Sequence, residues 1–326
     1  MKALVTGASG FIGNNVAKAL LDDGFQVRAL VRGNSTFTKE YGGELAQGDI
    51  RDVESVRQAV HGCDVVFHVA ALYTFWHRDP RTIYEVNVQG TKNVLQASLE
   101  AKVQRVVYTS TVSTVAPPEP GQVSNEDDYA MPEHLVGSYK RSKFQAEQEA
   151  MKLWEKGLPL VVVNPTAPVG RGDVKPTPTG KTVLDFIRGR MPAYMETGLN
   201  IVDVEDVARG HILALKKGRP GQRYILGNRN MSLKEIFAVL AEVTGKRPPK
   251  LKIPYWLGLT AGYIDDAIEG KMLRMEPRIP LEGVKIARHP MYVDCSKAVK
   301  ELGLPQTPAE EALAKAVKWF NDNGYK

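Results

Sequence analysis

Short apolar runs alternate with longer amphipathic stretches through the first half of the chain. Runs of β-branched residues such as 65–67 and 160–163 are typical of strands that are buried on both faces of a sheet. Residues 10–23 have a helical pattern, lie between the apolar runs 3–5 and 27–31, and are followed by a glycine that can end a helix. This alternation predicts an α/β fold, a Rossmann-type, doubly wound parallel sheet with right-handed crossovers.

The pattern changes after Asn164. Residues 173–180 are rich in Pro, Thr and Gly and predict a loop, whereas 200–217 and 224–226 predict one more strand-helix unit and a further strand. The apolar stretch 255–264 predicts a core helix. It is far shorter than the roughly 20 residues that a membrane span needs, although it leaves peripheral association with a membrane open.

We therefore expect two structural parts. The first is the domain of the main sheet, and the second is a smaller mixed C-terminal lobe at the carboxyl edge of that sheet, where ligands of open α/β sheets lie. The expected boundaries are 1–165 for the Rossmann domain, with 196–227 returning to it, and 166–195 and 228–326 for the lobe.

Composition adds limits on partners and location. The chain has 326 residues, is 43% hydrophobic and carries a formal net charge of +6 that is spread along the sequence, which argues against a nucleic-acid partner. Cys63 and Cys295 lie far apart and lack metal-ligand spacing, so we expect buried, inert thiols in a reduced, cytoplasmic setting. We expect no signal peptide, because the first strand begins at once, and no metal.

A glycine-rich turn joins the first strand to the first helix. Gly7, Gly10 and Gly13 permit the tight turn, a close approach of the backbone to a pyrophosphate, and packing of the helix on the strand. The start of the helix, which includes Phe11 and Ile12, adds free N–H groups and partial positive charge for an anion. The turn therefore predicts a dinucleotide site.

Two later positions concern the adenosine half of such a cofactor. Asp49 follows the third strand and either accepts from the adenine amino group, with Ile50 against the ring, or caps the next helix. Arg32 ends the second strand, where an acid would bind the ribose hydroxyls of NAD. Its guanidinium can instead grip a 2′-phosphate, with further donors from residues 33–35. We expect NADP(H) as the preferred cofactor, with NAD(H) as the alternative.

A tyrosine and a lysine provide candidate catalytic chemistry. Tyr139 and Lys143 are four residues apart and share one face of a predicted helix. A nearby ammonium lowers the pKa of a tyrosine, so the pair could move a proton while a nicotinamide moves a hydride. The preceding strand ends in the hydroxyl-rich segment 109–113, which could hold the substrate oxygen or simply stabilise a loop by local hydrogen bonds.

Together these motifs resemble the extended short-chain dehydrogenase/reductase superfamily over nearly the whole chain. The resemblance is carried, in order, by the glycine turn, His68-Val69-Ala70-Ala71, Asn87-Val88-Gln89-Gly90-Thr91, the hydroxyl-rich segment and Tyr139 with Lys143. It implies that Thr111 takes the family's serine position, with Ser110 and Ser113 as rivals. It further implies that Lys143 contacts the nicotinamide ribose, that Asn87 belongs to the supporting network, and that the cofactor is lined by Ala70, Ala71, Pro165 and Thr166.

Two branches of the superfamily compete. The basic strand 27–32 and Asn164-Pro165-Thr166 resemble dihydroflavonol-4-reductase-type enzymes, which reduce carbonyls with NADPH. Residues 175–180, 191–194 and 197–200 resemble the bacterial group labelled hopanoid-associated sugar epimerases. Epimerases of the superfamily commonly carry an acid where Arg32 stands and keep NAD bound, which favours the reductases.

We therefore expect an NADP(H)-dependent oxidoreductase that reduces an aldehyde or ketone to an alcohol. The alternatives are a nucleotide-sugar epimerase or dehydratase with transient hydride transfer, and a non-catalytic, cofactor-sensing regulator. By the same resemblance, helices near 84–101 and 139–156 imply a homodimer. Candidate contacts for the small-molecule substrate are Tyr73, Trp76, Ser113, Lys181 and Tyr194.

Overall fold

The computed structural model describes residues 1–33 and 42–325. Its main layer is a parallel sheet with the strand order β10-β6-β5-β4-β1-β2-β3. The order reverses beside β1, the position at which doubly wound sheets bind ligands. The strands are β1 Lys2–Thr6, β2 Gln26–Val31, β3 Glu44–Gln47, β4 Val65–His68, β5 Arg105–Thr109, β6 Leu160–Pro165 and β10 Arg223–Leu226.

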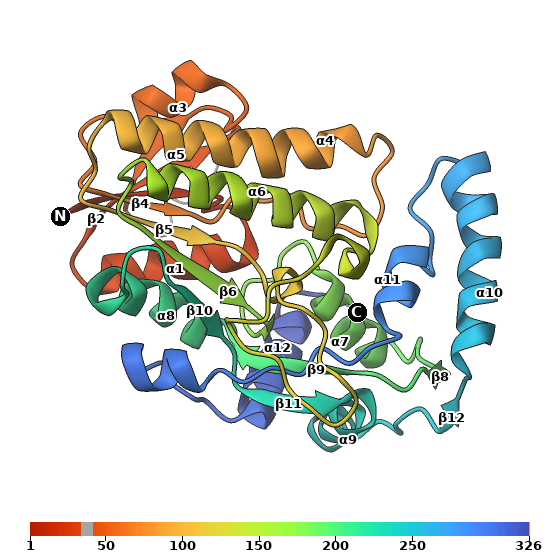
Figure 1. Ribbon diagram of the computed structural model, residues 1–326. Coiled ribbons are helices and arrows are strands. Elements are labelled where there is room, and N and C mark those ends of the chain that lie inside the picture. The colour runs from red at the N-terminus through yellow and green to blue at the C-terminus, as the bar shows by residue number, and fades with distance from the viewer. Residues whose placement is uncertain (34–41, 326) are drawn as a thin grey trace.

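Helices cover both faces of this sheet, as Figure 1 shows. One face packs against α1 (Phe11–Asp22) and α8 (Val204–Lys217), and the other against α3 (Val53–Val60), α5 (Gly90–Glu100) and α6 (Gly137–Glu155). Every residue of β4 and β6 is buried, as the unbroken apolar runs predicted. The predicted Rossmann-type fold is confirmed.

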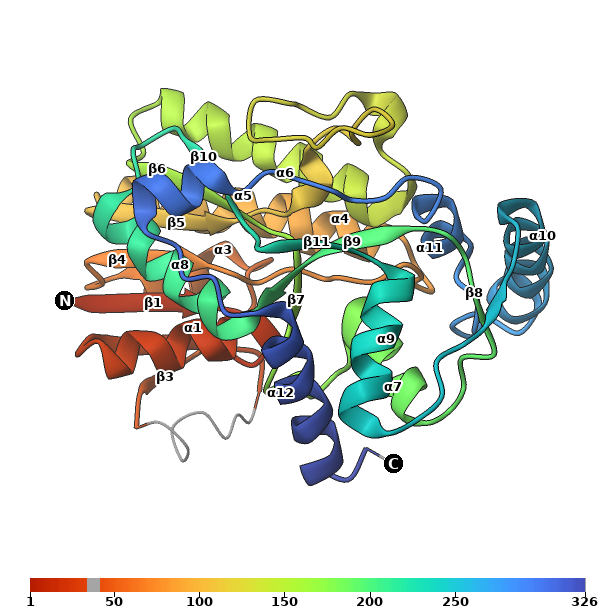
Figure 2. The same ribbon diagram turned by 90° about the horizontal axis from the view of Figure 1, so that it is seen from below.

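A smaller group of elements lies at the carboxyl end of the sheet, visible in Figure 2. Its mixed sheet has the order β11-β9-β7, in which β9 is antiparallel to β11 and parallel to β7. Its members are β7 Ala167–Val169, β9 Gly198–Asp203 and β11 Arg229–Ser232, packed on α7 Pro178–Ile187, α9 Leu233–Thr244 and α12 Ala309–Asp322. A further pair joins β8 Ala193–Tyr194 to β12 Leu251–Lys252. Within 196–227, α8 packs on α1 and β10 pairs with β6, whereas β9 lies in this second sheet.

Helix starts in this part follow local chemistry. The predicted capping box is present, with Glu235 N donating to Ser232 Oγ at 3.2 Å and Ser232 N donating to Glu235 Oε2 at 2.8 Å. The prediction of a loop over 173–180 is wrong for the last three residues, which are helical. Thr177 Oγ1 accepts from Gly180 N at 3.1 Å, and this cap starts α7 at Pro178, where proline is tolerated.

The predicted core helix at 255–264 is a helix but does not lie in the core. It forms α10 (Tyr255–Asp265), which continues into η4 (Asp266–Met272) at the outer edge of the molecule in both ribbon views (Figures 1 and 2). Only Gly258 and Gly262 of α10 are buried, and Trp256 is 65% exposed. No helix in the described residues is long and apolar enough to cross a bilayer.

Candidate active site

The glycine turn has the geometry of a phosphate-binding loop. Gly7 adopts φ +75°, and Gly10 N donates to Gly7 O at 2.8 Å. A β-carbon on Gly7 would lie 2.7 Å from Ala70 Cα, and one on Gly13 would lie 2.1 Å from Gly7 O, so both must be glycine for the chain to pack. At Gly10 the only described atom near a β-carbon is Gly7 O at 3.2 Å. The turn is therefore open beside Gly10.

The start of α1 suits an anion. Its cap residue makes no side-chain hydrogen bond, and its first turn, which includes Phe11 and Ile12, holds no acid. The first N–H groups and the positive end of the helix dipole are thus available to a pyrophosphate. The glycine turn fits the dinucleotide that the sequence predicts.

A histidine ties the turn to the neighbouring strand, and sequence reasoning assigned it no role. His68 Nδ1 is 2.8 Å from Thr6 Oγ1, and His68 Nε2 is 2.9 Å from Thr91 Oγ1. Thr6 Oγ1 also accepts from Ala70 N at 3.2 Å. Burial lowers the pKa of His68 to about 3, so the ring is neutral and acts as a fixed bridge. Ala71, next along, is exposed at the sheet edge.

Two guanidinium groups lie beyond β2 and β3, where the sequence predicts the adenosine half of the cofactor. Arg32 is exposed just beyond β2. Asp49 accepts from Arg51 Nε at 3.1 Å and from Arg51 Nη2 at 2.8 Å. The pKa of Asp49 is lowered chiefly by these bonds to Arg51, with a smaller contribution from the charge of Arg32. Sequence reasoning missed the pairing of Asp49 with Arg51.

The other residues predicted here are placed in different ways. Ile50 is buried, and its side chain packs against Gly90. Gly33 has φ +154°, while the predicted donors Asn34 and Ser35 lie outside the described residues. Pro165 ends β6, and Thr166 N donates to Leu226 O at 3.1 Å at the same edge of the sheet.

Lys143 and Tyr139 both point from α6 into buried surroundings. Lys143 Nζ donates to Tyr108 Oη at 3.1 Å and to Thr109 O at 2.9 Å. Burial lowers the pKa of Lys143 to about 7, and the charge of Glu147 opposes this shift. Burial raises the pKa of Tyr139 to about 12, and a hydrogen bond with the Thr111 side chain opposes that rise. The predicted lowering of the tyrosine pKa by Lys143 is wrong for these surroundings, because desolvation dominates.

The three rival hydroxyls at the end of β5 differ in their contacts. Ser110 Oγ donates to the buried Glu147 carboxylate, which occupies it. Thr111 Oγ1 accepts from Ser113 N at 3.2 Å and lies beside Tyr139. Ser113 is half-buried one turn further on. The structure thus brings Thr111 to the tyrosine, and Ser113 donates its N–H to Thr111.

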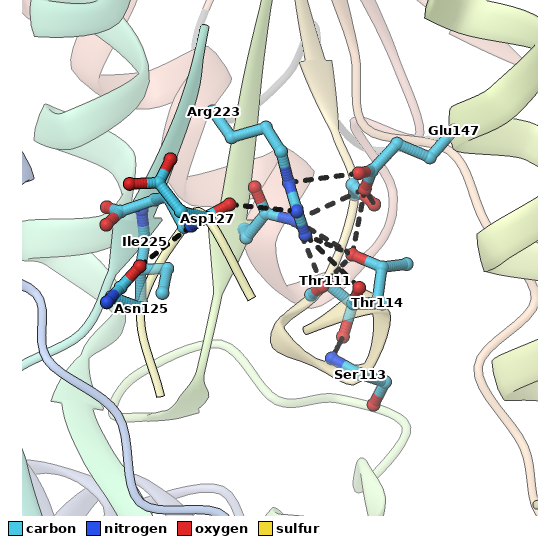
Figure 3. Close-up of polar contacts among 11 residues, drawn as sticks. Thr111, Ser113, Thr114, Asn125, Asp127, Glu147, Arg223 and Ile225 are labelled. Carbon is cyan, nitrogen blue, oxygen red and sulfur yellow. Dashed lines mark hydrogen bonds and ion pairs between the residues drawn. The ribbon is translucent and has the colours of Figure 1, made fainter. Parts of the chain in front are cut away.

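A buried ion pair supports this turn, shown in Figure 3. Arg223 Nε lies 3.0 Å from Glu147 Oε1, with side chains only 2% and 7% exposed. Thr114 Oγ1 donates to Glu147 Oε2 at 2.9 Å and to Thr111 O at 2.8 Å, and Asn164 Nδ2 donates to Thr111 O at 3.1 Å. The pair therefore fixes the backbone that carries Thr111.

Asn87 connects the helix of the tyrosine to the loop after β4. It lies in the π-helical turn Glu85–Gln89 and is fully buried. Its Oδ1 accepts from Leu72 N at 2.7 Å, and its Nδ2 donates to Ser142 Oγ at 2.9 Å. Asn87 therefore holds the start of the aromatic loop 72–77 against α6.

Among the predicted substrate contacts, Tyr73 is the one that meets Tyr139, with ring centroids 4.6 Å apart. Trp76 lies beside η4, where its Nε1 is 3.3 Å from a β-carbon placed on Gly270. Lys181 Nζ is 3.7 Å from Glu276 Oε1. Tyr194 packs in the smaller lobe, 5.9 Å from the Phe237 ring centroid, so it takes part in lobe packing.

The smaller lobe also closes over the start of α6. Glu282 of α11 (Leu281–Ile286) accepts from Ser138 N at 3.1 Å, next to Tyr139. Burial raises the pKa of Glu282, and the bond from Ser138 opposes the shift. In the described residues, no group of three or more His, Cys, Asp or Glu side chains could hold a metal ion.

A dinucleotide turn and a buried tyrosine-lysine pair at the edge of a Rossmann sheet define an NAD(P)-dependent oxidoreductase of the short-chain type. The model of the NAD dependent epimerase/dehydratase family matches residues 3–227. The chain belongs to that family, within the extended short-chain dehydrogenase/reductase superfamily.

Individual relatives match over almost their full lengths. "Putative dihydroflavonol 4-reductase" of Synechocystis sp. is 44% identical, over 98% of this chain and 95% of the relative. "Sterol demethylase protein B" of Methylococcus capsulatus is 35% identical, over 99% of each chain. The crystal structure of gox2253 is 40% identical, with a TM-score of 0.88 over 99% of this chain and 98% of that one.

Proposed function

We propose that the protein is an NADP(H)-dependent carbonyl reductase that converts an aldehyde or ketone to an alcohol. The observation that carries this proposal is the buried Tyr139 beside Thr111. A phenol is already protonated at neutral pH, and burial, which raises the pKa of Tyr139 to about 12, keeps on it the proton that reduction of a carbonyl requires. The 44% identity to a protein named "Putative dihydroflavonol 4-reductase" also supports reduction of a carbonyl.

Different residues of the chain would bind different parts of the cofactor. The turn with Gly7, Gly10 and Gly13 and the start of α1 would hold the pyrophosphate, and Arg32 would hold the 2′-phosphate. When bound, the reduced nicotinamide supplies the hydride. Ala70, Ala71, Pro165 and Thr166 border the same edge and would line the cofactor.

At the carbonyl, the Tyr139 hydroxyl donates its proton to the oxygen while the Thr111 hydroxyl holds that oxygen by a hydrogen bond. Lys143 would contact the ribose and, in its protonated form, would add a positive charge near the cofactor. Asn87 positions the loop that carries Tyr73, and Tyr73 forms an apolar wall for the substrate together with Trp76.

The direct test follows NADPH oxidation with a panel of aldehydes, ketones and nucleotide sugars. We expect stoichiometric NADPH consumption with a carbonyl substrate, and Tyr139→Phe is expected to lower kcat about 10²- to 10⁴-fold while cofactor binding is retained. Tyr129→Phe, an exposed tyrosine, serves as the matched control. An isomerised sugar without net cofactor use would instead identify an epimerase, and cofactor binding without any turnover would identify a regulator.

We also propose a homodimer and a cytoplasmic location for the enzyme. The dimer would use the exposed sides of α5 and α6, which pack side by side on one face of the sheet. Light scattering of the purified chain checks the assembly. A monomer at all concentrations would contradict it.

A further inference from the structure

Exposed apolar side chains concentrate on one part of the surface. Of the twenty large apolar side chains that are exposed in the described chain, ten fall between residues 251 and 279. We call this the apolar face. It comprises Leu251, Trp256, Leu257, Tyr263, Ile264, Ile268, Met272, Leu273, Met275 and Ile279. Clusters of this kind on a single protein mark a contact surface.

Helix α10, which belongs to this face, is apolar on its outward side as well as on its inward side. The outward side of α10 carries Trp256, Tyr263 and Ile264 at helical spacing, and these are 65%, 52% and 56% exposed. The inward side holds the buried Gly258 and Gly262 together with half-buried residues, among them Tyr255, Leu259 and Asp265. A surface helix in water normally places its apolar side inward and its charges outward. The outward side of α10 is therefore built for apolar surroundings.

The segment that carries the apolar face also carries an excess of exposed basic residues, which we call the basic rim; one of them, Lys252, pairs with the exposed Glu196. Among the charged side chains of residues 246–288, a single acidic residue, Glu276, is exposed. The other acids of this segment are half-buried, and Glu269, for example, accepts from Arg278 N at 3.0 Å. The exposed basic residues number eight and are Lys246, Arg247, Lys250, Lys252, Lys271, Arg274, Arg278 and Arg288.

We propose that the apolar face docks on the surface of a bilayer that contains anionic phospholipids. Trp256 and Tyr263 suit the headgroup level, where amphipathic rings are favoured, and the aliphatic side chains reach the acyl boundary. The basic rim complements the negative lipid phosphates. A second copy of the chain is a poorer occupant, because a two-fold contact would place two positive rims against each other.

The apolar face is connected to the candidate active site through α11. A β-carbon placed on Gly283 of α11 would lie 3.3 Å from Phe75 Cδ2. Phe75 contacts Tyr73 edge-on, with ring centroids 5.7 Å apart, and Tyr73 contacts Tyr139. Docking would thus bring the aromatic loop close to lipid. If the proposed function holds, on which this point rests, the substrate is a carbonyl compound that partitions into membranes.

The test measures co-sedimentation of the full chain with vesicles, without substrate or cofactor. We expect binding to mixed phosphatidylcholine and phosphatidylglycerol vesicles, weaker binding to phosphatidylcholine alone, and release by salt. The triple variant Trp256→Gln, Ile264→Gln, Met272→Gln is expected to bind the mixed vesicles about tenfold or more weakly. Its thermal midpoint should be unchanged, because the three side chains are exposed.

A matched control replaces three exposed apolar residues elsewhere, Val53→Gln, Val123→Gln and Val174→Gln, and should bind like the wild type. Absence of binding to the mixed vesicles, or equal binding by the triple variant, would overturn the proposal. So would a lipid-free dimer that the triple variant abolishes, since the face would then serve a second copy. A negative vesicle-binding result would not contradict the proposed NADPH-dependent reduction. A negative reductase assay would not contradict the proposed membrane docking.

Discussion

Lys143 Nζ donates to Tyr108 Oη at 3.1 Å, so a tyrosine other than Tyr139 holds the lysine. Tyr108 is fully buried and stacks on His68 with ring centroids 5.6 Å apart. The hydroxyl is one of two acceptors that hold the ammonium, the other being Thr109 O. Tyr108 is therefore a positioning residue for Lys143 rather than a catalytic one.

Tyr108→Phe removes that acceptor and should make the Lys143 ammonium easier to deprotonate. The pKa of Lys143, already lowered to about 7 by burial, is expected to fall further. If the ammonium is the active form, kcat/KM declines as pH rises through this pKa, so the midpoint of the decline should move to lower pH. Tyr224→Phe, another fully buried tyrosine, is the control and should leave the pH profile in place.

Arg32→Asp is expected to reverse the cofactor preference. A carboxylate in place of the guanidinium repels the 2′-phosphate, and the loss of one charge-assisted contact should weaken NADPH relative to NADH about 10- to 100-fold. Titration of both cofactors gives the ratio. Arg51→Gln should change the ratio little, because Arg51 is engaged by Asp49. If the wild type prefers NADH, the proposed contact of Arg32 with the 2′-phosphate is wrong.

The Glu147–Arg223 pair should show strong coupling in stability. Arg223→Met leaves a buried carboxylate without its counter-charge and is expected to cost about 3–5 kcal/mol of unfolding free energy. Combining it with Glu147→Gln removes the stranded charge, so the double variant should lose less than the sum of the two single losses. Urea unfolding measures all four proteins. Additive losses would show that the pair does not act as a unit.

Lys140 should destabilise the fold near neutral pH. It is 9% exposed, its Nζ contacts Met291 Sδ at 3.9 Å, and burial lowers its pKa from 10.5 to about 8. Below about pH 8 the buried charge therefore lowers the free energy of unfolding. This destabilisation decreases as pH rises from about 8 to 10.5, because the unfolded chain then also loses the proton of this lysine.

Lys140→Met removes the penalty and should raise the unfolding free energy at neutral pH by about 1–3 kcal/mol. The difference from wild type should shrink between pH of about 8 and 10, as the linkage requires. Urea unfolding at several pH values checks this. A variant of unchanged stability that has lost turnover would contradict the burial argument and point instead to a substrate contact.

Much of the fold could be predicted from sequence because its signals are local. The glycine turn, the buried run 160–163 and the capping box at Ser232 each specify a conformation within a few residues, and the structure has all three. That a hydroxyl at the end of β5 lies near Tyr139 could be expected from the carboxyl edge of a parallel sheet, but the choice of Thr111 over Ser110 and Ser113 came from the resemblance to the superfamily.

Other features depend on contacts that sequence patterns do not encode. Glu147 and Arg223 come from different elements and meet only because β10 pairs with β6. The apolar residues of 255–264 predicted a helix correctly but not its surface position. An apolar pattern does not say whether the helix packs in the core or lies on the surface. The pKa of Tyr139 depends on total burial, which a tyrosine-lysine spacing does not reveal.

The late position of β10 in the chain has a consequence for biosynthesis. A nascent chain that has left the ribosome only as far as Pro165 already contains Thr111, Tyr139 and Lys143, but the outer edge of β6 still lacks its neighbour. Glu147 has no ion-pair partner at 3.0 Å until Arg223 emerges. The proposed catalytic groups are thus translated before the strand and the arginine that support them, so we expect a product truncated at Pro165 to carry the whole motif without activity.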